Sequence, residues 1–395
     1  GKLSPCSSVQ VVGRFPFANR FPARSQRRSM DLQALVDAAS TRDWDTNPEG
    51  TVPLAVVGLG NYARNVSIPA IEAGDYAEVG AVVSGDPEKA ERVADDHGAV
   101  PLSYETYAEG AGLDAYDAAY VATPNRLHLD HVRTAANHGK HVICEKPLEA
   151  TTERAVAAVD ACEDAGVTLM TAYRMQADPV IRALGSFVSR GGIGDPTKAM
   201  GEFTFPVLDG SKGPDQWRLD AELAGGGALV DVGVYPLNTT RYLLGADPGA
   251  VEAMAHASEP FGDRPDDSDS PRFADEHVHV LASFPEGVVG EFTASFSGDA
   301  DSWLELAGSD GRIRVEDAFV PGADRTVRVS TTDGDVELSG LGADETREEF
   351  DYFAHCVLTG TPPEPDGQDG LTDVAIMDAA YEAAESGERV TLTRR

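Results

Sequence analysis

Val52-Pro-Leu-Ala-Val-Val-Gly58-Leu-Gly60-Asn-Tyr-Ala63 predicts a buried strand that turns at once into a helix. The Gly-x-Gly-x-x-Ala pattern supplies a tight turn, close approach of the backbone to a pyrophosphate, and close packing of the helix on a sheet. Alone, this pattern is weak evidence. Between a strand and a helix it predicts a dinucleotide site, with the pyrophosphate at the helix N-terminus.

Strands and helices alternate from this stretch to residue 172. The predicted strands are 52–58, 78–84, 118–123, 141–144 and 167–172, and the predicted helices are 58–74, 87–97, 128–138 and 152–165, with a helical turn near 104–107. Strands joined by helices of this length form a parallel, doubly wound sheet. We therefore predict the α/β class, with an N-terminal Rossmann dinucleotide-binding domain over residues 48–172.

After residue 173 the pattern changes to strands at 198–208, 251–258, 277–284, 288–296, 302–307 and 326–330. Phe292, Ala294 and Phe296 fall on one face of their strand, which is typical of an antiparallel sheet with one packed side. Helices are predicted at 227–244, 344–358 and 372–386, and loops at 258–274 and 361–370. Residues 173–395 are thus predicted to form an α+β domain with an open, predominantly antiparallel sheet.

Residues 1–29 differ from the rest because they carry basic residues and no acidic one. Arg27-Arg28 is similar to a twin-arginine export signal, but Asp31 and Asp37 fall where such a signal has its apolar segment. We predict a basic, partly disordered extension and a leader helix over residues 1–47, with the helix at 31–40. Met30 is considered as the natural start.

The chain is strongly acidic: its 395 residues include 66 Asp and Glu against 32 Lys and Arg, a formal net charge of -34. Such a surface repels nucleic-acid phosphates and anionic lipid, and no apolar run is long enough to span a membrane. We therefore expect neither a nucleic-acid nor a membrane partner. We interpret the charge as adaptation to molar salt, where a Debye length of about 3 Å screens the self-repulsion. An ordinary acidic protein is the alternative.

Cysteines and histidines give no metal pattern. The four cysteines are far apart, which predicts reduced thiols and a cytoplasmic protein. The histidine pairs at 128 and 131 and at 277 and 279 have no carboxylate or cysteine at ligand spacing. We therefore predict no metal site.

The end of the second strand decides between the two nicotinamide cofactors. Where an NAD site has an acid for the ribose 2′-OH, this chain has Ser84, and Lys89 or Arg92 follows on the next helix. A serine and a basic residue suit the 2′-phosphate of NADP, which we favour. Asp86 keeps NAD open, because it can accept the 2′-OH or cap the helix that begins at Pro87.

Two further strand ends carry polar residues. Glu145-Lys146-Pro147 follows an apolar run, and a lysine there can reach both a bound nucleotide and its substrate. Lysine is scarce in this chain, which makes Lys146 more informative. Thr123-Pro-Asn125, with His128 nearby, ends the preceding strand and can bond the nicotinamide ribose or carboxamide. Asn125 equally well caps the next helix.

Asp231 and Tyr235 are four residues apart in a predicted helix, hence on one face. A tyrosine beside a lysine ammonium loses its proton more readily and can act as a base. Without such a lysine, Tyr235 reads as a core residue and Asp231 as a surface or capping acid.

The motifs Gly58-Leu-Gly60-Asn61-Tyr62-Ala63, Thr123-Pro-Asn125 with His128, Glu145-Lys146-Pro147 and Asp231-x-Gly233-x-Tyr235 together resemble those of the Gfo/Idh/MocA oxidoreductases, over residues 52–392. Many members of that family have histidine where this chain has Tyr235. The resemblance implies a Rossmann domain followed by a substrate-binding and oligomerisation domain, whose open sheet joins a homo-oligomer, a dimer or tetramer.

The resemblance also implies roles. Lys146 would hold the substrate hydroxyl and the nicotinamide ribose, Tyr235 would take a proton, and Asp231 would orient substrate or lysine. Trp217 and Arg218 would line the pocket of a sugar. The cofactor contacts would come from Gly58, Gly60, Asn61, Tyr62, Ala63, Ser84, Lys89, Thr123, Asn125, His128, Glu145 and Lys146.

The implied activity is NADP-dependent oxidation of an aldopentose, D-xylose, at C1 to the lactone. Another sugar, inositol or a trans-dihydrodiol is the alternative substrate. A non-enzymatic, nucleotide-sensing protein is a third hypothesis, because a fold alone never fixes an activity.

Overall fold

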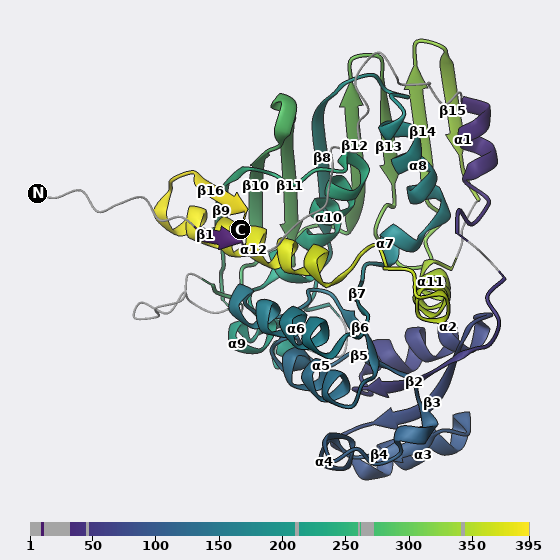
Figure 1. Ribbon diagram of the computed structural model, residues 1–395. Coiled ribbons are helices and arrows are strands. Elements are labelled where there is room, and N and C mark those ends of the chain that lie inside the picture. The colour runs from purple at the N-terminus through teal and green to yellow at the C-terminus, as the bar shows by residue number, and fades with distance from the viewer. Residues whose placement is uncertain are drawn as a thin grey trace, which may run out of the picture. The chain divides into compact units, whose positions relative to one another are not determined.

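The computed structural model describes residues 9–11, 32–44, 47–209, 213–259, 261, 272–340 and 344–394 (Figure 1). They divide into a Rossmann unit, Thr41–Pro179 with Ala343–Leu371, and a sheet unit, the described residues of Gly1–Ser40, Val180–Gly342 and Thr372–Arg395. The predicted division at residues 47 and 172 stays a prediction. Most of the predicted extension at 1–29 and of the loop at 258–274 lies outside the described residues. No helix in the described ranges is both long and apolar enough to cross a membrane.

The Rossmann unit contains a six-stranded sheet, in the order β4-β3-β2-β5-β6-β7, whose neighbours all pair in parallel. Its strands are β2 (Val52–Val57), β3 (Ala77–Val83), β4 (Val100–Leu102), β5 (Ala118–Val121), β6 (His141–Glu145) and β7 (Leu169–Ala172). Its helices are η2 (Ala63–Ser67), α2 (Ile68–Ala73), α3 (Pro87–His97), α4 (Tyr104–Ala108), η3 (Leu113–Ala115), η4 (Asn125–Leu127), α5 (His128–Asn137), α6 (Thr152–Ala165), α7 (Arg174–Ala177) and α11 (Glu345–Thr359). The predicted doubly wound parallel sheet is confirmed.

The strand order reverses at β2, which has β3 on one side and β5 on the other. Ligands of open α/β sheets bind outside the carboxyl ends of the strands at such a point. In the register of the sheet, Val57 is paired with Val121, and Val121 with Cys144. The predicted turns after β2, β5 and β6 therefore lie at the same edge of the sheet, on neighbouring strands.

The sheet unit contains a ten-stranded sheet in the order β1-β16-β9-β10-β11-β8-β12-β13-β14-β15, antiparallel except for the pairs β1–β16 and β8–β11. Its strands are β1 (Val9–Val11), β8 (Pro196–Thr204), β9 (Ala250–His256), β10 (His277–Ser283), β11 (Val289–Ser295), β12 (Asp301–Gly308), β13 (Gly311–Glu316), β14 (Thr326–Thr331), β15 (Gly334–Leu338) and β16 (Val390–Arg394). Its helices are α1 (Leu32–Ala38), α8 (Pro179–Ser189), η5 (Trp217–Leu219), α9 (Ala221–Ala224), η6 (Leu229–Gly233), α10 (Val234–Leu244), η7 (Pro285–Gly287) and, from Thr372 on, α12 (Gly367–Ser386). The predicted open, mainly antiparallel sheet is confirmed.

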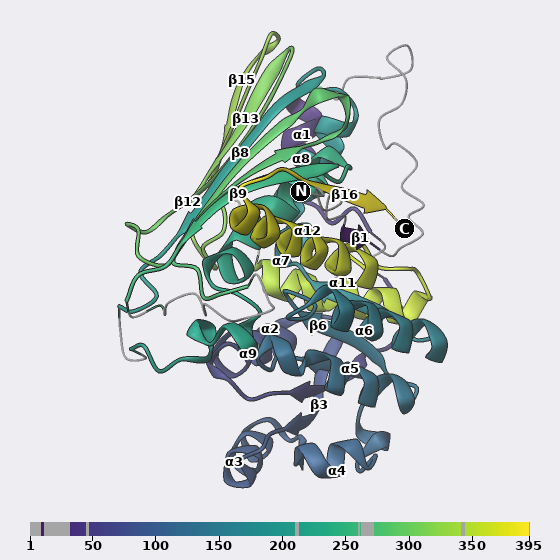
Figure 2. The same ribbon diagram turned by 90° about the vertical axis from the view of Figure 1, so that its left-hand side faces the viewer.

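One face of this sheet is packed by helices. Figure 2 shows α8 and α12 on the same side of it. Val280 of β10 lines the same small internal space as Leu237 of α10 and Met377 of α12. His277, His279 and Leu281 alternate with these inward residues and are exposed on the opposite face. The strand pattern thus separates a core face from an open face.

The predictions of helices and strands failed for short or glycine-rich segments whose structure depends on neighbouring segments. The prediction did not include β4, β13, β15, β16, α7 or α8. The predicted loop at 361–370 is wrong at its end, because α12 begins at Gly367. The Asp366 carboxylate accepts from the Asp369 N–H at 2.9 Å. Asp-Gly-Gln-Asp-Gly reads as a turn, but the aspartate caps a helix.

Helix α11 lies late in the chain but belongs to the Rossmann unit. Phe350 and Phe353 are completely buried in the same core cluster as Val56 and Ile71. Each such side chain contributes about 1.5–3 kcal/mol by its burial. The Rossmann core is therefore completed by a helix that lies, in sequence, between two segments of the sheet unit.

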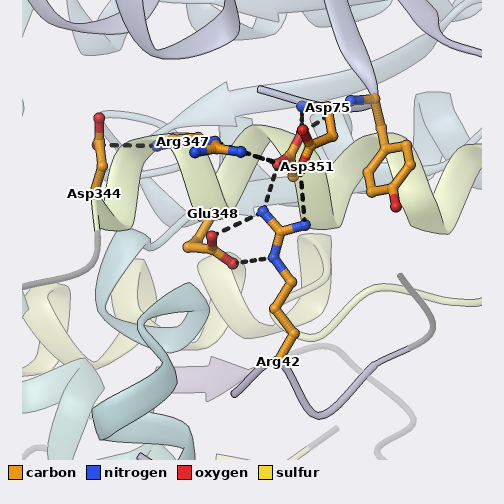
Figure 3. Close-up of polar contacts among 7 residues, drawn as sticks. Arg42, Asp75, Asp344, Arg347, Glu348 and Asp351 are labelled. Carbon is orange, nitrogen blue, oxygen red and sulfur yellow. Dashed lines mark hydrogen bonds and ion pairs between the residues drawn. The ribbon is translucent and has the colours of Figure 1, made fainter. Parts of the chain in front are cut away.

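A polar cluster fixes α11 to the loop before β3 (Figure 3). Oδ1 of the fully buried Asp351 accepts from the backbone N–H of Asp75 at 2.7 Å and of Tyr76 at 3.0 Å. Its Oδ2 accepts from Arg42 at 2.6 Å, and Arg42 also binds Glu348 at 2.7 and 2.8 Å. Burial opposes the charge of Arg42, but these two carboxylates raise the pKa of its guanidinium above the usual value.

Candidate functional site

The turn after β2 is shaped for a ligand. Gly58 has φ of +99°, and a Cβ there would lie 2.8 Å from the carbonyl oxygen of Ala122, so the position requires glycine. A Cβ on Gly60 would meet nothing within 4 Å, which leaves the backbone open to close approach. Ala63 is 1% exposed and packs the helix on the sheet. A pyrophosphate needs such a cradle.

Asn61 and Tyr62 open the helix after this turn. The side-chain oxygen of Asn61 accepts from Arg64 Nη2 at 3.0 Å. Arg64, which the sequence analysis did not single out, therefore brings a cation to the start of the helix. A phosphate at this point would meet both the positive helix end and a guanidinium.

At the end of β3, Ser84 and Asp86 form a tight turn. The Ser84 hydroxyl accepts from the N–H of Asp86 at 3.1 Å, and the Asp86 carboxylate accepts from the N–H of Lys89 at 3.1 Å, which caps α3. The ammonium of Lys89 lies 4.0 Å from Asp86. Of the two alternatives for Asp86, the structure shows the helix cap.

Tyr104 also stands at this strand end, although only its helical turn was predicted. A Cβ on Gly85 would lie 3.2 Å from the Tyr104 ring, and this ring lies 4.8 Å from that of His131, centroid to centroid. Burial raises the pKa of Tyr104 and lowers that of His131 to about 4. A neutral aromatic pair of this kind is a suitable stacking surface for a nucleotide base.

The turn after β5 is held from behind by His128, which is completely buried. Its Nε2 lies 2.9 Å from the carbonyl oxygen of Thr123, and its Nδ1 lies 3.2 Å from that of Leu148. His128 thus ties two strand-end loops together. The buried Thr123 hydroxyl has no hydrogen-bond partner among the described residues, and Asn125 is 4% exposed. A bound nicotinamide ribose would supply the partner that Thr123 lacks.

Glu145 is the last residue of β6, and Lys146 follows it. Oε2 of Glu145 accepts from the backbone N–H of Lys146 at 3.2 Å, and Oε1 accepts from the Tyr120 hydroxyl at 2.7 Å. The backbone of Lys146 is therefore fixed at the carboxyl edge of the sheet, one strand away from the Thr123 turn.

The sheet unit brings together Trp217, Arg218 and Asp231. Arg218 Nε donates to Asp231 Oδ2 at 3.0 Å, and the guanidinium lies 4.9 Å from the centre of the Trp217 ring. Asp231 lies in η6, a π-helical turn, and Tyr235 lies in the α-helix that follows. The helical stretch predicted over 227–244 is therefore helical from Leu229 to Leu244, and its first part has the wider π-helical turn.

Tyr235 is half-buried among aromatic rings. Its ring centroid lies 5.6 Å from that of Phe203 and 6.0 Å from that of Phe319. The start of the helical segment is anchored by Asp275, which accepts from the N–H of Gly227 at 2.8 Å and of Leu229 at 2.9 Å. Burial raises the pKa of Asp275. Phe203, Phe319 and Asp275 come from distant segments, and nothing in their local sequence marked them.

Each unit carries one part of the predicted chemistry. The Rossmann unit has a glycine cradle, an arginine in the helix that follows it, a lysine in the helix after β3 and another lysine directly after β6, which suits a dinucleotide. The sheet unit has a phenol and an arginine–aspartate pair, which suits a neutral polyol and proton transfer. No group of three or more His, Cys, Asp or Glu in the described part of the chain could hold a metal ion.

Comparison with known proteins gives consistent findings. Residues 52–173 match the oxidoreductase family with an NAD-binding Rossmann fold, GFO/IDH/MocA, and residues 181–314 match the GFO/IDH/MocA C-terminal domain. An NADP(+) D-xylose 1-dehydrogenase of Haloarcula marismortui is 43% identical over 92% of this chain and 100% of its own. A second D-xylose 1-dehydrogenase (NADP(+)), from Haloferax volcanii, is 32% identical over 85% of this chain and 98% of its own.

Solved structures agree. The aldose-aldose oxidoreductase of Caulobacter crescentus, complexed with glycerol, has a TM-score of 0.78 and 31% identity, over 87% of this chain and 100% of its own. A 3-ketoreductase of Actinomadura kijaniata with NADP and TDP-benzene has a TM-score of 0.73 and 25% identity, over 88% of this chain and 100% of its own.

Proposed function

The chain belongs to the Gfo/Idh/MocA family of oxidoreductases, and we propose that it oxidises the aldopentose D-xylose at C1 to the lactone, with NADP as cofactor. The observation that carries this proposal is the similarity to two D-xylose 1-dehydrogenases along nearly their whole length. The lysine at the end of β6 and the tyrosine of α10 are the residue types that such a reaction needs.

Tyr235 takes the proton of the C1 hydroxyl, and the Lys146 ammonium holds the oxygen on which negative charge develops. NADP, when bound, supplies the acceptor for the hydride that leaves C1. The ion pair with Arg218 fixes the carboxylate of Asp231, which orients a neighbouring sugar hydroxyl. Trp217, under the same arginine, gives the sugar ring an apolar wall. Lactone, reduced cofactor and one proton are the products.

The choice of NADP follows from the end of β3. Asp86 is engaged as the cap of α3, so its carboxylate is held by the Lys89 N–H. The Ser84 hydroxyl, which accepts from the Asp86 N–H, still has a proton to donate to a 2′-phosphate, and the Lys89 ammonium beside Asp86 supplies a cation. A cation forms charge-assisted hydrogen bonds with a phosphate. These are stronger than the hydrogen bond that it forms with a neutral ribose 2′-OH.

A substrate panel tests the activity. We expect NADP reduction in concentrated KCl to be fastest with D-xylose, compared with other aldoses, myo-inositol and a trans-dihydrodiol, and followed by the absorbance of reduced nicotinamide. The value of kcat/KM for NADP should exceed that for NAD by at least roughly tenfold, which is about 1.4 kcal/mol. Faster reduction with inositol would assign another substrate, and no reduction with any polyol would reject the dehydrogenase.

The net charge of -34 supports a halophilic enzyme, since molar salt screens the repulsion of an acidic surface. Cys144, Cys162 and Cys356 are buried cysteines. Reduced thiols and NADP chemistry fit the reducing cytoplasm, which is where we place the enzyme.

The open face of the ten-stranded sheet supports a homo-oligomer. Met254, Leu281 and Val289 lie on that face, on the neighbouring strands β9, β10 and β11, and are 77%, 39% and 46% exposed. No described helix covers this side in Figure 2. A second copy of the chain, packed through the same face, would bury these side chains in an isologous contact.

Light scattering of the Met254→Asp variant tests the oligomer. A charge in place of an apolar side chain weakens a subunit contact that buries it, so we expect the variant to have a lower mass than the wild-type oligomer. Val100→Asp is the control, because Val100 is 38% exposed in the Rossmann unit. A monomeric wild type, or the same mass for all three proteins, would reject this contact.

A further inference from the structure

A chain of buried hydroxyl groups runs behind the Glu145-Lys146-Pro147 segment. Ser67 Oγ lies 2.8 Å from the hydroxyl of Tyr120, and that hydroxyl donates to Glu145 Oε1 at 2.7 Å. Ser67 and Tyr120 are both completely buried. The other oxygen of Glu145 accepts from the backbone N–H of Lys146. This hydrogen-bonded network therefore ends at the backbone N–H of Lys146, the proposed catalytic residue.

The directions of these bonds follow from the chemistry of the groups. A tyrosine hydroxyl has one proton, and here it goes to the carboxylate of Glu145. The Tyr120 oxygen is then left as an acceptor, so Ser67 donates to it. Burial and the charge of Glu145 raise the pKa of Tyr120 well above its usual value, which keeps this donor protonated.

Helix α11 packs against this network. The ring of Phe350 meets that of Tyr120 edge-on, with centroids 4.9 Å apart and an interplanar angle of 90°, which fixes the direction of the phenol. Glu349, on the same helix, is 2% exposed. Burial and the charge of Glu145 raise its pKa well above the usual value, although Arg174 opposes this.

We infer that Tyr120 is a positioning residue for Lys146: it holds one oxygen of Glu145, so that the other can hold the backbone N–H from which the lysine side chain extends. The inference rests on the catalytic role proposed for Lys146. No contact of Tyr120 with substrate or cofactor is required. A loss of its hydroxyl should therefore act on the rate of hydride transfer and leave binding almost unchanged.

Tyr120→Phe tests the inference in the full-length enzyme. We expect kcat with D-xylose and NADP to fall by roughly 10- to 100-fold, because a small displacement of a catalytic group has effects of this size. The KM values for both substrates should stay within about threefold. With D-xylose deuterated at C1, the isotope effect on kcat should rise, since hydride transfer becomes slow relative to product release.

Tyr116→Phe is the matched control. Tyr116 is 1% exposed, lies in the same unit, and its hydroxyl has no hydrogen-bond partner among the described residues. We expect its kcat and isotope effect to equal those of the wild type. Ser67→Ala keeps the Tyr120–Glu145 bond but removes the donor behind it, so kcat should fall by only about two- to fivefold.

The outcomes separate the two proposals. A wild-type protein that reduces NADP with no polyol would overturn the proposed function, and with it the role of Lys146. An active wild type whose Tyr120→Phe variant keeps kcat within twofold would overturn the inference alone. So would an equal loss in Tyr116→Phe. Should Tyr120→Phe fail to fold, an unchanged kcat and isotope effect in Ser67→Ala would reject the network.

Discussion

Lys146→Met is expected to lower kcat by at least roughly a thousandfold, about 4 kcal/mol of transition-state stabilisation. Methionine keeps the length and apolar stem of lysine but removes the positive charge that directly follows β6. The backbone of residue 146 would stay in place, because Glu145 holds its N–H. The loss of kcat should therefore come from the missing ammonium and not from a displaced backbone. NADP affinity, measured by quenching of protein fluorescence, should stay within about threefold, because the glycine cradle and Lys89 are untouched.

Lys140→Met provides the matched control, because Lys140 precedes the strand that Lys146 follows. The ammonium of Lys140 donates to the carbonyl oxygens of Leu113 at 2.9 Å and Tyr116 at 2.6 Å, a structural contact at the opposite edge of the sheet. Its replacement should lower stability and leave kcat nearly unchanged. More than about a tenth of the wild-type kcat in Lys146→Met would contradict electrostatic stabilisation by this ammonium.

The elements that the sequence predicts best are those whose ends are chemically marked. Helices at 87–97 and 152–165 have the predicted bounds. Asp86 and Thr151 cap their first turns, and Gly98 and Gly166 end them in the left-handed conformation, each with φ of +67°. Caps act within one turn of the chain, so a local pattern contains the whole cause.

Elements that depend on distant partners were missed. Val100-Pro-Leu102 forms β4 only because β3 offers it an edge to pair with. The helical pattern of α11 was visible, but its assignment to the Rossmann core was not, since an apolar stripe does not say which core it joins. Phe350 and Asp351 have partners that lie more than two hundred residues away.

The same limit applies to the candidate site. The motifs around Gly58, Ser84 and Lys146 were visible because each is a local departure from an apolar pattern. Tyr120 was not, because Ala-Ala-Tyr-Val reads as an ordinary buried strand. Its hydroxyl gains a role only from Ser67 and Glu145, which the sheet brings to it.

The cluster around Asp351 makes a prediction about stability (Figure 3). Asp351 is completely buried, and its carboxylate accepts from two backbone N–H groups and from Arg42. The guanidinium of Arg347 forms a second ion pair with it at 3.8 Å. The side chain of Arg42 is 15% exposed, and so is partly removed from water. If the carboxylate of Asp351 is removed, the backbone N–H groups and the Arg42 guanidinium lose their acceptor, and water cannot replace it for all of them. Leaving one partner of a buried pair uncompensated costs more than the pair itself contributes.

We therefore expect Asp351→Ala to lower the free energy of unfolding by about 3–5 kcal/mol, as measured by urea titration in concentrated KCl. Asp351→Asn should lose less, because an amide oxygen can still accept from the N–H groups of Asp75 and Tyr76. Glu88→Ala is the comparison at the surface, where the Arg92–Glu88 pair is 3.7 Å apart and both side chains are largely exposed; its effect should stay below about 1 kcal/mol. An Asp351→Ala variant no less stable than Glu88→Ala would mean that α11 is held by its apolar face alone.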